Sequence, residues 1–351
     1  MILMSKRILA AACAAATALA LSACSPSAST GGKTSKDGTL TVMASFYPLK
    51  YLAEKVGGEH VTVTSLTPDG AEPHDLELSP KMVDSLASAD AVVYLAGFQG
   101  AVDEAVEQHA PKTVIDVSSA AQLVAIDSTS NHPGEDEGTD EAQSGEAQSG
   151  EAADHDHEGH EHEGHDHEHA DHDHDHHHDM SMDPHFWLDP ARMANAATLV
   201  GDKLAEADPT NAETYKANAQ ALNEELTSLG DNLVAKTSTC QIKTFVTAHT
   251  AFGYLADRTG LTQVGISGLD PESSPSPARL AEIGKIVKDQ GVTTIFTEAL
   301  IDPKVEQTLA TDLGISTAVL DPIESQTDSS KDYAAVMNDN IDALTKANNC
   351  Q

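Results

Sequence analysis

The segment TNAETYKANAQALNEELTSLGDNLVA, residues 210–235, carries one apolar stripe along its whole length. The stripe follows a strict 4-3-4-3-4 spacing, which is typical of one face of an α-helix. Its members are Tyr215, Ala219, Leu222, Leu226, Leu229 and Leu233. At 1.5 Å per residue such a helix is ~40 Å long, enough to run the height of a domain. We interpret it as a rigid connection between two lobes; the alternative is an ordinary core helix.

Before this helix, short β-rich runs alternate with helical stretches. Helices are predicted over 48–56 and 81–88, the second opened by Ser79 as N-cap and by Pro80 at its first position. The β-rich runs are residues 39–45, 61–66, 91–96 and 113–118. An order of β-α-β-α predicts a parallel sheet with right-handed crossovers.

After the long helix the alternation repeats. Ser276-Pro277 opens a helix that ends near Gly291, and Asp302-Pro303 opens one that ends near Gly314. The β-rich runs here are residues 243–248, 263–267, 293–298 and 316–321. The second half is therefore predicted to be another α/β lobe.

The predicted fold class is α/β, with two lobes that each contain a mainly parallel sheet. The N-terminal lobe covers 39–190, a helical linker covers 191–238, and the C-terminal lobe covers 239–351; Asp189-Pro190 is the start signal of the first helix of the linker. Open α/β sheets bind ligands at the carboxyl ends of their strands. We therefore expect the binding site in the cleft between the lobes.

The N-terminus has the pattern of a targeting segment. A positively charged start is followed by an apolar run over 8–21, which is too short to span a bilayer. Residues 21–24, Leu-Ser-Ala-Cys, resemble a bacterial lipobox. We predict a signal peptide over 1–23, a lipid on Cys24 and a flexible tether over 24–38. An ordinary secretory signal is the alternative.

In an exported protein of this kind, two cysteines remain, Cys240 and Cys350. The oxidising setting favours a disulfide between them, which would tie the C-terminus to the start of the second lobe. Two buried free thiols are the alternative.

A long stretch of the chain is extremely acidic and rich in histidine. The chain has a formal net charge of −36, and residues 135–179 supply half of it, with 18 acidic residues and no Lys or Arg. Such charge argues against binding to nucleic acid or to anionic membranes. The absence of apolar periodicity predicts that 131–180 is a disordered loop.

This loop is predicted to hold a row of weak metal sites. Neighbouring imidazoles and carboxylates bind Zn²⁺, but each site must first order a flexible chain, which costs ~1–2 kcal/mol per residue. The histidines concerned are His155, His157, His160, His162, His165, His167, His169, His172, His174, His176, His177 and His178. A solubilising acidic segment and an expression tag are the alternatives.

Three histidines outside the loop lie beside predicted strand ends or helix starts, and these are His74, His185 and His249. Asp321 ends another predicted strand, although an Asp-Pro pair is equally typical of a helix cap or a turn. Three imidazoles and one carboxylate form a tetrahedral set that suits Zn²⁺. The remaining histidines, His60, His109 and His132, are interpreted as solvated surface residues.

Four motifs carry a resemblance to a known family. They are TPDGAEPHDLELSP around His74, DPHFWLDP around His185, VTAHTAFGYLADRTGL around His249, and the run from Phe296 to Ile323. The chain resembles the metal-binding lipoproteins of bacterial zinc and manganese uptake ABC transporters, the cluster A-I family, and its zinc-specific members in particular.

The resemblance implies two lobes bridged by one long helix, with little hinge movement and a metal ion between them. It assigns His74 and His185 of the first lobe and His249 and Asp321 of the second as ligands. Manganese-type relatives have a carboxylate where His249 stands, so the histidine favours Zn²⁺ over Mn²⁺. Some zinc-type relatives have a carboxylate where this chain has Pro73, which favours Asp321 as the fourth ligand; Glu298 and water are the alternatives.

Glu72, Asp189 and Glu298 are candidates to hold the ligand histidines in one tautomer. The His-rich loop also recurs in zinc-type relatives at this position.

The predicted function is that of a monomeric extracytoplasmic receptor, anchored by lipid to the outer face of the cell membrane. It would bind Zn²⁺ and deliver it to a permease driven by a cytoplasmic ATPase, with binding that weakens as the pH falls through ~6.5. An enzyme is disfavoured, because the His-rich loop contains no H-E-x-x-H motif. A cell-surface zinc store or chaperone and an Mn²⁺ receptor of the same family are the alternatives.

Overall fold

The structure is a computed structural model that describes residues 38–109, 111–126, 131–132 and 181–351. The predicted signal peptide, Cys24, most of the tether and the twelve histidines of the acidic loop lie outside the described residues. In the part that is described, no helix is long and apolar enough to cross a membrane.

The first lobe is built on a four-stranded parallel sheet. Its strands are β1 (Leu40–Ala44), β2 (Val61–Ser65), β3 (Ala91–Tyr94) and β4 (Thr113–Asp116), in the order β2-β1-β3-β4. Central β1 pairs in parallel with both neighbours, with Val42 opposite Val63 on one side and Ala91 on the other.

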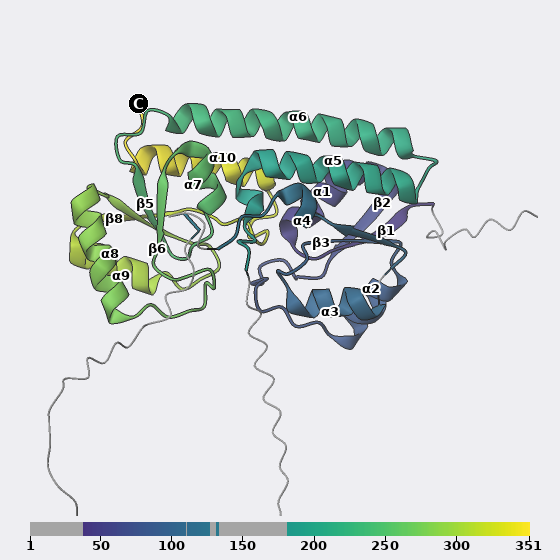
Figure 1. Ribbon diagram of the computed structural model, residues 1–351, viewed down its shortest axis with the longest axis horizontal. Coiled ribbons are helices and arrows are strands. Elements are labelled where there is room, and N and C mark those ends of the chain that lie inside the picture. Colours follow the sequence, from purple (N-terminus) through teal and green to yellow (C-terminus); the bar gives the residue numbers. More distant parts are fainter. Residues whose placement is uncertain (1–37, 110, 127–130, 133–180) are drawn as a thin grey trace, which may run out of the picture. The chain divides into compact units, whose positions relative to one another are not determined.

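Both faces of this sheet are covered by helices, because the side chains of its central strands alternate between two apolar clusters. Val42 and Val93 face the helices α1 (Tyr47–Gly57) and α5 (Pro190–Ala207), whereas Met43 and Val92 face the other side. That second side is covered by α2 (Pro80–Ser88) and α3 (Gly100–His109), and the short α4 (Ser118–Ala121) follows β4. Figure 1 shows this layering in the blue and purple half of the ribbon.

The second lobe repeats the topology. Its strands are β5 (Thr244–Thr247), β6 (Thr262–Gly265), β7 (Thr294–Thr297) and β8 (Ser316–Val319), all parallel and in the order β6-β5-β7-β8. Its helices are α7 (Gly253–Thr259), α8 (Pro277–Gln290), α9 (Lys304–Leu313) and α10 (Tyr333–Ala347). The two-lobed α/β class and all eight predicted strands are confirmed.

Helix boundaries largely follow the local signals. Ser79 Oγ accepts a hydrogen bond from the backbone N of Met82 at 3.4 Å and caps α2, and Ser276 caps α8 by accepting from Arg279 N at 3.1 Å. Gly291 and Gly314 end α8 and α9 in the left-handed region, at φ 68° and 70°. Helices α3, α4, α7 and α10 were not predicted from the sequence.

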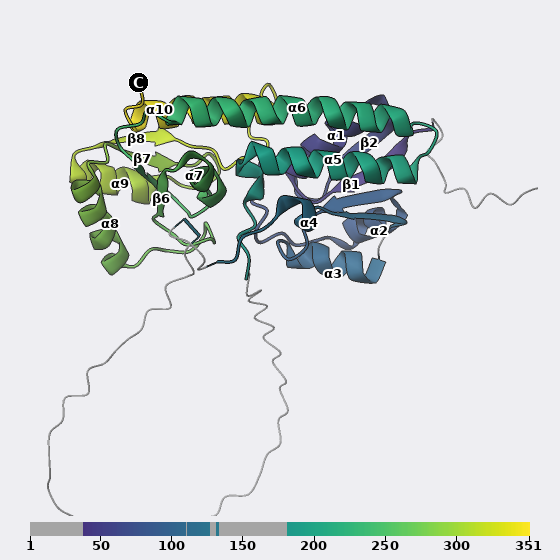
Figure 2. The ribbon, with the colours of Figure 1, turned by 45° about the horizontal axis from the view of Figure 1, so that its top comes forward.

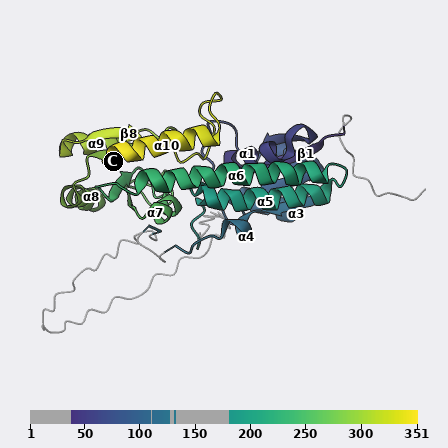
Figure 3. The same ribbon diagram turned by 90° about the horizontal axis from the view of Figure 1, so that it is seen from above.

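Helix α6 (Ala212–Thr237) runs across both lobes, as Figures 1 and 2 show. It packs against α1 and α5 of the first lobe and against α7 and α10 of the second. Figure 3, seen from above, places α5 along one side of α6 and α10 along the other. The six residues of the apolar stripe are all at least nine-tenths buried, and they join one apolar cluster that includes residues of both lobes. The helix therefore gives the two lobes a shared core.

Close packing of α5 on α6 depends on a small residue. A Cβ atom at Gly201 of α5 would collide with the Cβ of Ala219 and would lie 3.3 Å from the carbonyl oxygen of Tyr215. The two helices approach here at a distance that only glycine permits.

Cys240 and Cys350 form a disulfide, which confirms the predicted pairing. The bond is reinforced by backbone hydrogen bonds from Gln241 N to Asn349 O at 3.3 Å and from Ile242 N to Asn348 O at 3.1 Å. These contacts hold the end of α10 beside the segment that enters β5.

Replacing Leu226 by alanine should lower the free energy of unfolding by about 3 kcal/mol, because it opens a cavity where α6 meets the shared core. Leu226 is fully buried, whereas neighbouring Thr227 is exposed, so Thr227→Ala is a matched control. Urea denaturation followed by circular dichroism measures both. Equal stability of the two variants would contradict the role of the stripe.

Removal of the disulfide, by reduction or as Cys240→Ser with Cys350→Ser, should lower the free energy of unfolding by roughly 4–5 kcal/mol. The bond closes a loop over a sequence separation of 110, and its loss raises the entropy of the unfolded chain. Thermal unfolding with and without reductant tests this; an unchanged midpoint after complete thiol alkylation would refute it.

Candidate metal centre

Three imidazole nitrogens converge on one carboxylate oxygen between the lobes. The Nε2 atoms of His74, His185 and His249 lie 3.4, 3.5 and 3.4 Å from Oε1 of Glu324. The four potential ligand atoms all lie within 4.8 Å of one another. In a tetrahedral Zn²⁺ complex with bonds of about 2.0–2.1 Å, neighbouring ligand atoms are about 3.3 Å apart. The three distances from the imidazole nitrogens to Glu324 Oε1 therefore match the spacing expected around a tetrahedral ion.

Each of the four residues follows a strand or precedes a helix, at the carboxyl edges of the two sheets. His74 lies between β2 and α2, and His185 immediately precedes the 3-10 helix η2 (Phe186–Leu188). His249 follows β5, and Glu324 follows β8. The first lobe thus contributes two imidazoles, and the second contributes one imidazole and the carboxylate, so the group exists only when both lobes are in place.

Asp183 orients the ring of His185. Its Oδ1 accepts hydrogen bonds from His185 Nδ1 at 2.8 Å and from the backbone N of His185 at 2.9 Å. An imidazole that donates from Nδ1 leaves Nε2 as the atom with a free lone pair. The Nε2 of His185 is therefore directed to the centre as a ligand.

Glu298 does the same for His249. Its Oε1 accepts from His249 Nδ1 at 2.7 Å and from the backbone N of His249 at 3.1 Å. Both histidines are fully buried, and Asp183 and Glu298 are at least nine-tenths buried. Each lobe therefore uses one buried carboxylate to grip both the ring and the backbone of its histidine.

His74 is held differently. Glu72 Oε1 accepts a hydrogen bond from the backbone N of His74 at 2.7 Å, and the His74 ring packs edge-on against Phe98 with ring centroids 4.9 Å apart. Burial, together with the nearby charge of Glu324, raises the pKa of Glu72 to about 8. Glu72 thus holds the backbone of the loop that carries His74, and packing against Phe98 holds the His74 ring.

Two polar atoms of the centre lack ordinary partners. The Nε2 atoms of His185 and His249 are buried and have no hydrogen-bond partner. Buried polar atoms in folded proteins are nearly always satisfied, so two such atoms that face one carboxylate indicate a site for a cation. A divalent ion would satisfy all four groups together.

The four residues of the group shift one another's pKa values. Burial alone would raise the pKa of Glu324, but the three histidines around its Oε1 outweigh burial and hold that pKa well below its usual range. Burial lowers the pKa of His74. Burial would also lower the pKa of His249, but the Glu298 and Glu324 carboxylates raise it well above the usual value. Glu324 is therefore an anion at neutral pH.

Asp321, predicted as the fourth ligand, is not a member of this group, and Glu324 stands in its place. The Oδ1 of Asp321 instead accepts a hydrogen bond from the backbone N of Ile323 at 2.8 Å, and its backbone is bonded to the Asn340 amide. Ile323 adopts a left-handed conformation, with φ 56°, and the chain turns there before Glu324. The Asp-Pro pair is thus a turn, and the one available signal for Glu324 was a second carboxylate three residues after Asp321.

Only some of the predicted partners contact the ring of a ligand histidine. Glu298 contacts a ligand ring, as described above. Asp189 does not: its Oδ1 caps α5 by accepting from Ala191 N at 2.9 Å, and it lies 3.4 Å from Nη1 of Arg258. Asp183, which was not among the predicted partners, occupies the role expected of Asp189.

The interpretation of His132 as a solvated surface residue is wrong. Its side chain is fully buried, and both ring nitrogens lie within hydrogen-bonding distance of carboxylates. His109, by contrast, is exposed at the end of α3.

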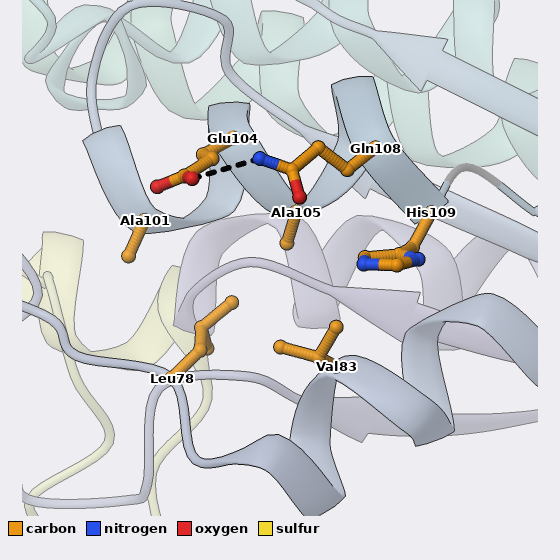
Figure 4. Close-up of a pocket in the computed structure, with 7 residues that line it drawn as sticks. All are labelled: Leu78, Val83, Ala101, Glu104, Ala105, Gln108 and His109. Atoms are coloured by element: carbon orange, nitrogen blue, oxygen red, sulfur yellow. Dashed lines mark hydrogen bonds between the residues drawn. The ribbon is translucent and has the colours of Figure 1, made fainter.

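A separate cavity of about 240 Å³ lies on the outer side of the first lobe, between α2 and α3 (Figure 4). Apolar residues form much of its wall, and Glu104 accepts a hydrogen bond from Gln108 at 2.8 Å at its rim. The residues that line it are Leu78, Val83, Ala101, Glu104, Ala105, Gln108 and His109. It contains none of the four residues of the metal group.

Two parallel-sheet lobes, a long shared helix and a His₃Glu group supplied by both lobes define a two-lobed metal-binding protein. The family model described as "Zinc-uptake complex component A periplasmic" matches residues 42–347, and the chain belongs to this family.

Among curated proteins, the zinc-binding protein AdcA of Streptococcus pyogenes is 33% identical over 313 residues, which cover 88% of this chain and 56% of AdcA. The chain thus spans about half the length of the AdcA relatives that it matches. The high-affinity zinc uptake system protein ZnuA of Bacillus subtilis is 31% identical over 339 residues, 94% of each chain.

Solved structures show the same architecture. AdcAII of Streptococcus pneumoniae is 28% identical with a TM-score of 0.69, covering 88% of this chain and 98% of AdcAII. The Zn(II)-bound ZnuA-like domain of Streptococcus pneumoniae AdcA is 28% identical with a TM-score of 0.66, covering 89% and 99%.

The positions of Glu324 and Asp321 make a direct comparison possible. Glu324→Gln, which removes the anionic oxygen at the centre, should weaken Zn²⁺ binding at least about 100-fold. Asp321→Asn keeps an oxygen acceptor for Ile323 N and should change the affinity less than roughly 3-fold. Competition against a chromogenic chelator measures both; a larger loss in Asp321→Asn than in Glu324→Gln would show that the fourth ligand is misassigned.

Proposed function

We propose that this chain is an extracytoplasmic receptor that binds one Zn²⁺ ion at His74, His185, His249 and Glu324. It then delivers the ion to a membrane permease driven by a cytoplasmic ATPase. The convergence of three imidazole Nε2 atoms on one buried carboxylate oxygen carries this proposal. Membership of the zinc-uptake family supports the transport role.

The ligand chemistry favours Zn²⁺. Three neutral imidazoles and one carboxylate give a site charge near +1 with a divalent ion, and this mixture of ligands suits Zn²⁺ better than Mn²⁺, which prefers oxygen. The zinc-bound solved structures that the chain resembles agree with this choice.

The centre is arranged for binding rather than for catalysis. Catalytic zinc sites keep one position open for water or substrate, whereas here four protein atoms that lie within 4.8 Å of one another are available. Four protein ligands complete the coordination shell of the ion. We therefore propose that the ion is cargo.

Contacts across the lobes support a small movement on release. Trp187 Nε1 donates to the carbonyl of Pro322 at 2.7 Å, and Tyr254 OH donates to the carbonyl of Asp183 at 2.7 Å. Both bonds join residues of different lobes close in sequence to His185 or Glu324, and α6 packs against helices of both lobes. Release through local rearrangement of the second-lobe ligands fits this construction better than a wide hinge opening.

We further propose that a lipid on Cys24 holds the receptor at the outer face of the cell membrane. The histidines of the acidic segment 155–178 would bind metal ions weakly close to the receptor. Weak sites at high local concentration raise capture without high affinity of their own. A zinc store would instead bind many ions with similar affinity, so the stoichiometry of tight binding separates the two functions.

Zinc titration of the full-length protein should show one tight ion together with several weak ones. His249→Ala should abolish the tight ion, since it removes one of the four ligands, and deletion of residues 133–180 should abolish only the weak ones. Isothermal titration calorimetry with chelator competition measures each class. Loss of the tight ion in the deletion, with its survival in His249→Ala, would overturn the cleft site.

Zinc binding should weaken as the pH falls. Without the ion, the pKa values of His185 and His249 are raised, because nearby carboxylates outweigh the effect of burial, so Zn²⁺ must displace protons from them. At pH values below these raised pKa values, the apparent affinity should fall about tenfold per pH unit for each displaced proton. Competition titrations across this range, with calorimetry in two buffers to count released protons, test it; an affinity independent of pH would contradict it.

A further inference from the structure

Asn131 and His132 form a buried bridge between the lobes. His132 is fully buried and Asn131 is 7% exposed, although both lie in the most acidic and least apolar part of the chain. Residues 131–132 contact the second lobe at α7 and β6 and contact the first lobe at Asp183.

The His132 ring lies between two carboxylates. Its Nδ1 is 2.5 Å from Oδ2 of Asp183, and its Nε2 is 3.0 Å from Oδ2 of Asp257 on α7. Ionised carboxylates only accept hydrogen bonds, so a ring that bonds both must donate from both nitrogens, as an imidazolium does. The Tyr254 ring packs edge-on against it, with centroids 4.8 Å apart.

Asn131 fastens the same segment to the second lobe. Its Nδ2 donates to Asp257 Oδ1 at 2.8 Å, its Oδ1 accepts from Gln263 N at 3.1 Å, and its carbonyl accepts from Gln263 Nε2 at 2.5 Å. The first residue of α7, Gly253, leaves the space, because a Cβ there would lie 2.6 Å from His132 Cε1. The seat for residues 131–132 is thus a specific structure in the second lobe.

Asp183 connects this seat to the metal centre. One of its oxygens, Oδ2, faces His132, and the other, Oδ1, accepts from the ring and the backbone of His185. Burial would raise the pKa of Asp183, but its hydrogen bonds to both histidines outweigh this and lower it to about 2. A continuous chain therefore runs Asp257, His132, Asp183, His185, from α7 of the second lobe to a ligand of the first.

We propose that His132 is a positioning residue for the metal ligand His185, acting through Asp183. It holds Asp183 with Oδ1 toward His185 Nδ1, so that Nε2 stays directed at the ion, and it ties this ligand to the second lobe. The inference rests on the proposed function, since it assigns a role at the same zinc site. Loss of the His132 link should leave Asp183 free to rotate and His185 free to change tautomer, which weakens binding.

Asparagine and glutamine at position 132 separate this role from simple packing. The amide nitrogen of asparagine replaces Nδ1 and can donate to Asp183, whereas that of glutamine replaces Nε2 and can donate only to Asp257. His132→Ala and His132→Gln should weaken tight Zn²⁺ binding about 10-fold, which is at the low end of the losses typical when a partner of a metal ligand is removed. His132→Asn should retain most of the affinity. His109→Ala, at an exposed histidine of α3, is the control and should bind as the unmodified protein does.

The measurements are chelator-competition affinity in the full-length protein, the visible absorption of the Co²⁺-substituted protein and thermal unfolding without metal. The Co²⁺ bands should shift in His132→Ala and return in His132→Asn, because they report the ligand geometry. Equal losses in the asparagine and glutamine variants, or lower thermal stability with unchanged affinity and Co²⁺ spectrum, would overturn the inference.

Two deletions give a second test. Both replace the acidic segment by the same short Gly-Ser linker and remove all twelve of its histidines, but one starts at residue 133 and the other at 131, each ending at 180. The first keeps Asn131 and His132 and should retain tight binding, and the second should lose about 10-fold. Equal affinity of the two deletions would also overturn the inference.

The variants distinguish a failure of the proposed function from a failure of the role of His132. If His249→Ala binds the tight ion as the unmodified protein does, the zinc site itself is wrong, and the role of His132 falls with it. If His249→Ala loses the tight ion but His132→Ala does not, only the role of His132 is wrong.

Discussion

Three imidazoles and a carboxylate can be buried together only if something compensates for their lost hydration, and the fold is organised around that constraint. Burial of an ionised carboxylate such as Glu324 costs several kcal/mol unless charge and hydrogen bonds offset it. The three histidines around Glu324 offset this cost. Asp183 and Glu298 in turn each accept hydrogen bonds from the ring and the backbone of one of these histidines. Because the ligands come from both lobes, the centre also requires the lobes to be held in register, and α6 with its shared apolar cluster does this.

Much of the fold could be predicted because it depends on patterns among residues that are neighbours in the sequence. Alternating apolar runs, serine-proline helix starts and glycine stops depend on neighbouring residues, so the eight strands and the helix over 212–237 were found with small errors at their ends. Helices α7 and α10 were missed because they are short or because their apolar faces become clear only once the second sheet and α6 are in place. Their existence depends on packing partners far away in the sequence.

The site residues also differ in whether local sequence signals or distant partners determine their role. His74, His185 and His249 were found because each stands beside a strand end or a helix start, where α/β folds gather ligands. Asp321 stood in an equally good place, but its carboxylate is used by the turn at Ile323, and whether an Asp-Pro pair binds a backbone amide or a metal ion is not a local property. His132 was misread because its partners Asp183 and Asp257 are 51 and 125 residues away in the chain.

The short distance from His132 to Asp183 also has a consequence for how this protein can vary. His132 and Asp183, which lie on either side of residues 133–180 in the sequence, are joined to each other, so a change in the length of that interval need not move either of them. Doubling the length of a loop costs only about 0.6 kcal/mol in closure entropy. This junction, which leads through Asp183 to the metal centre, should therefore accept intervals of different length without a change in the described contacts of the two lobes.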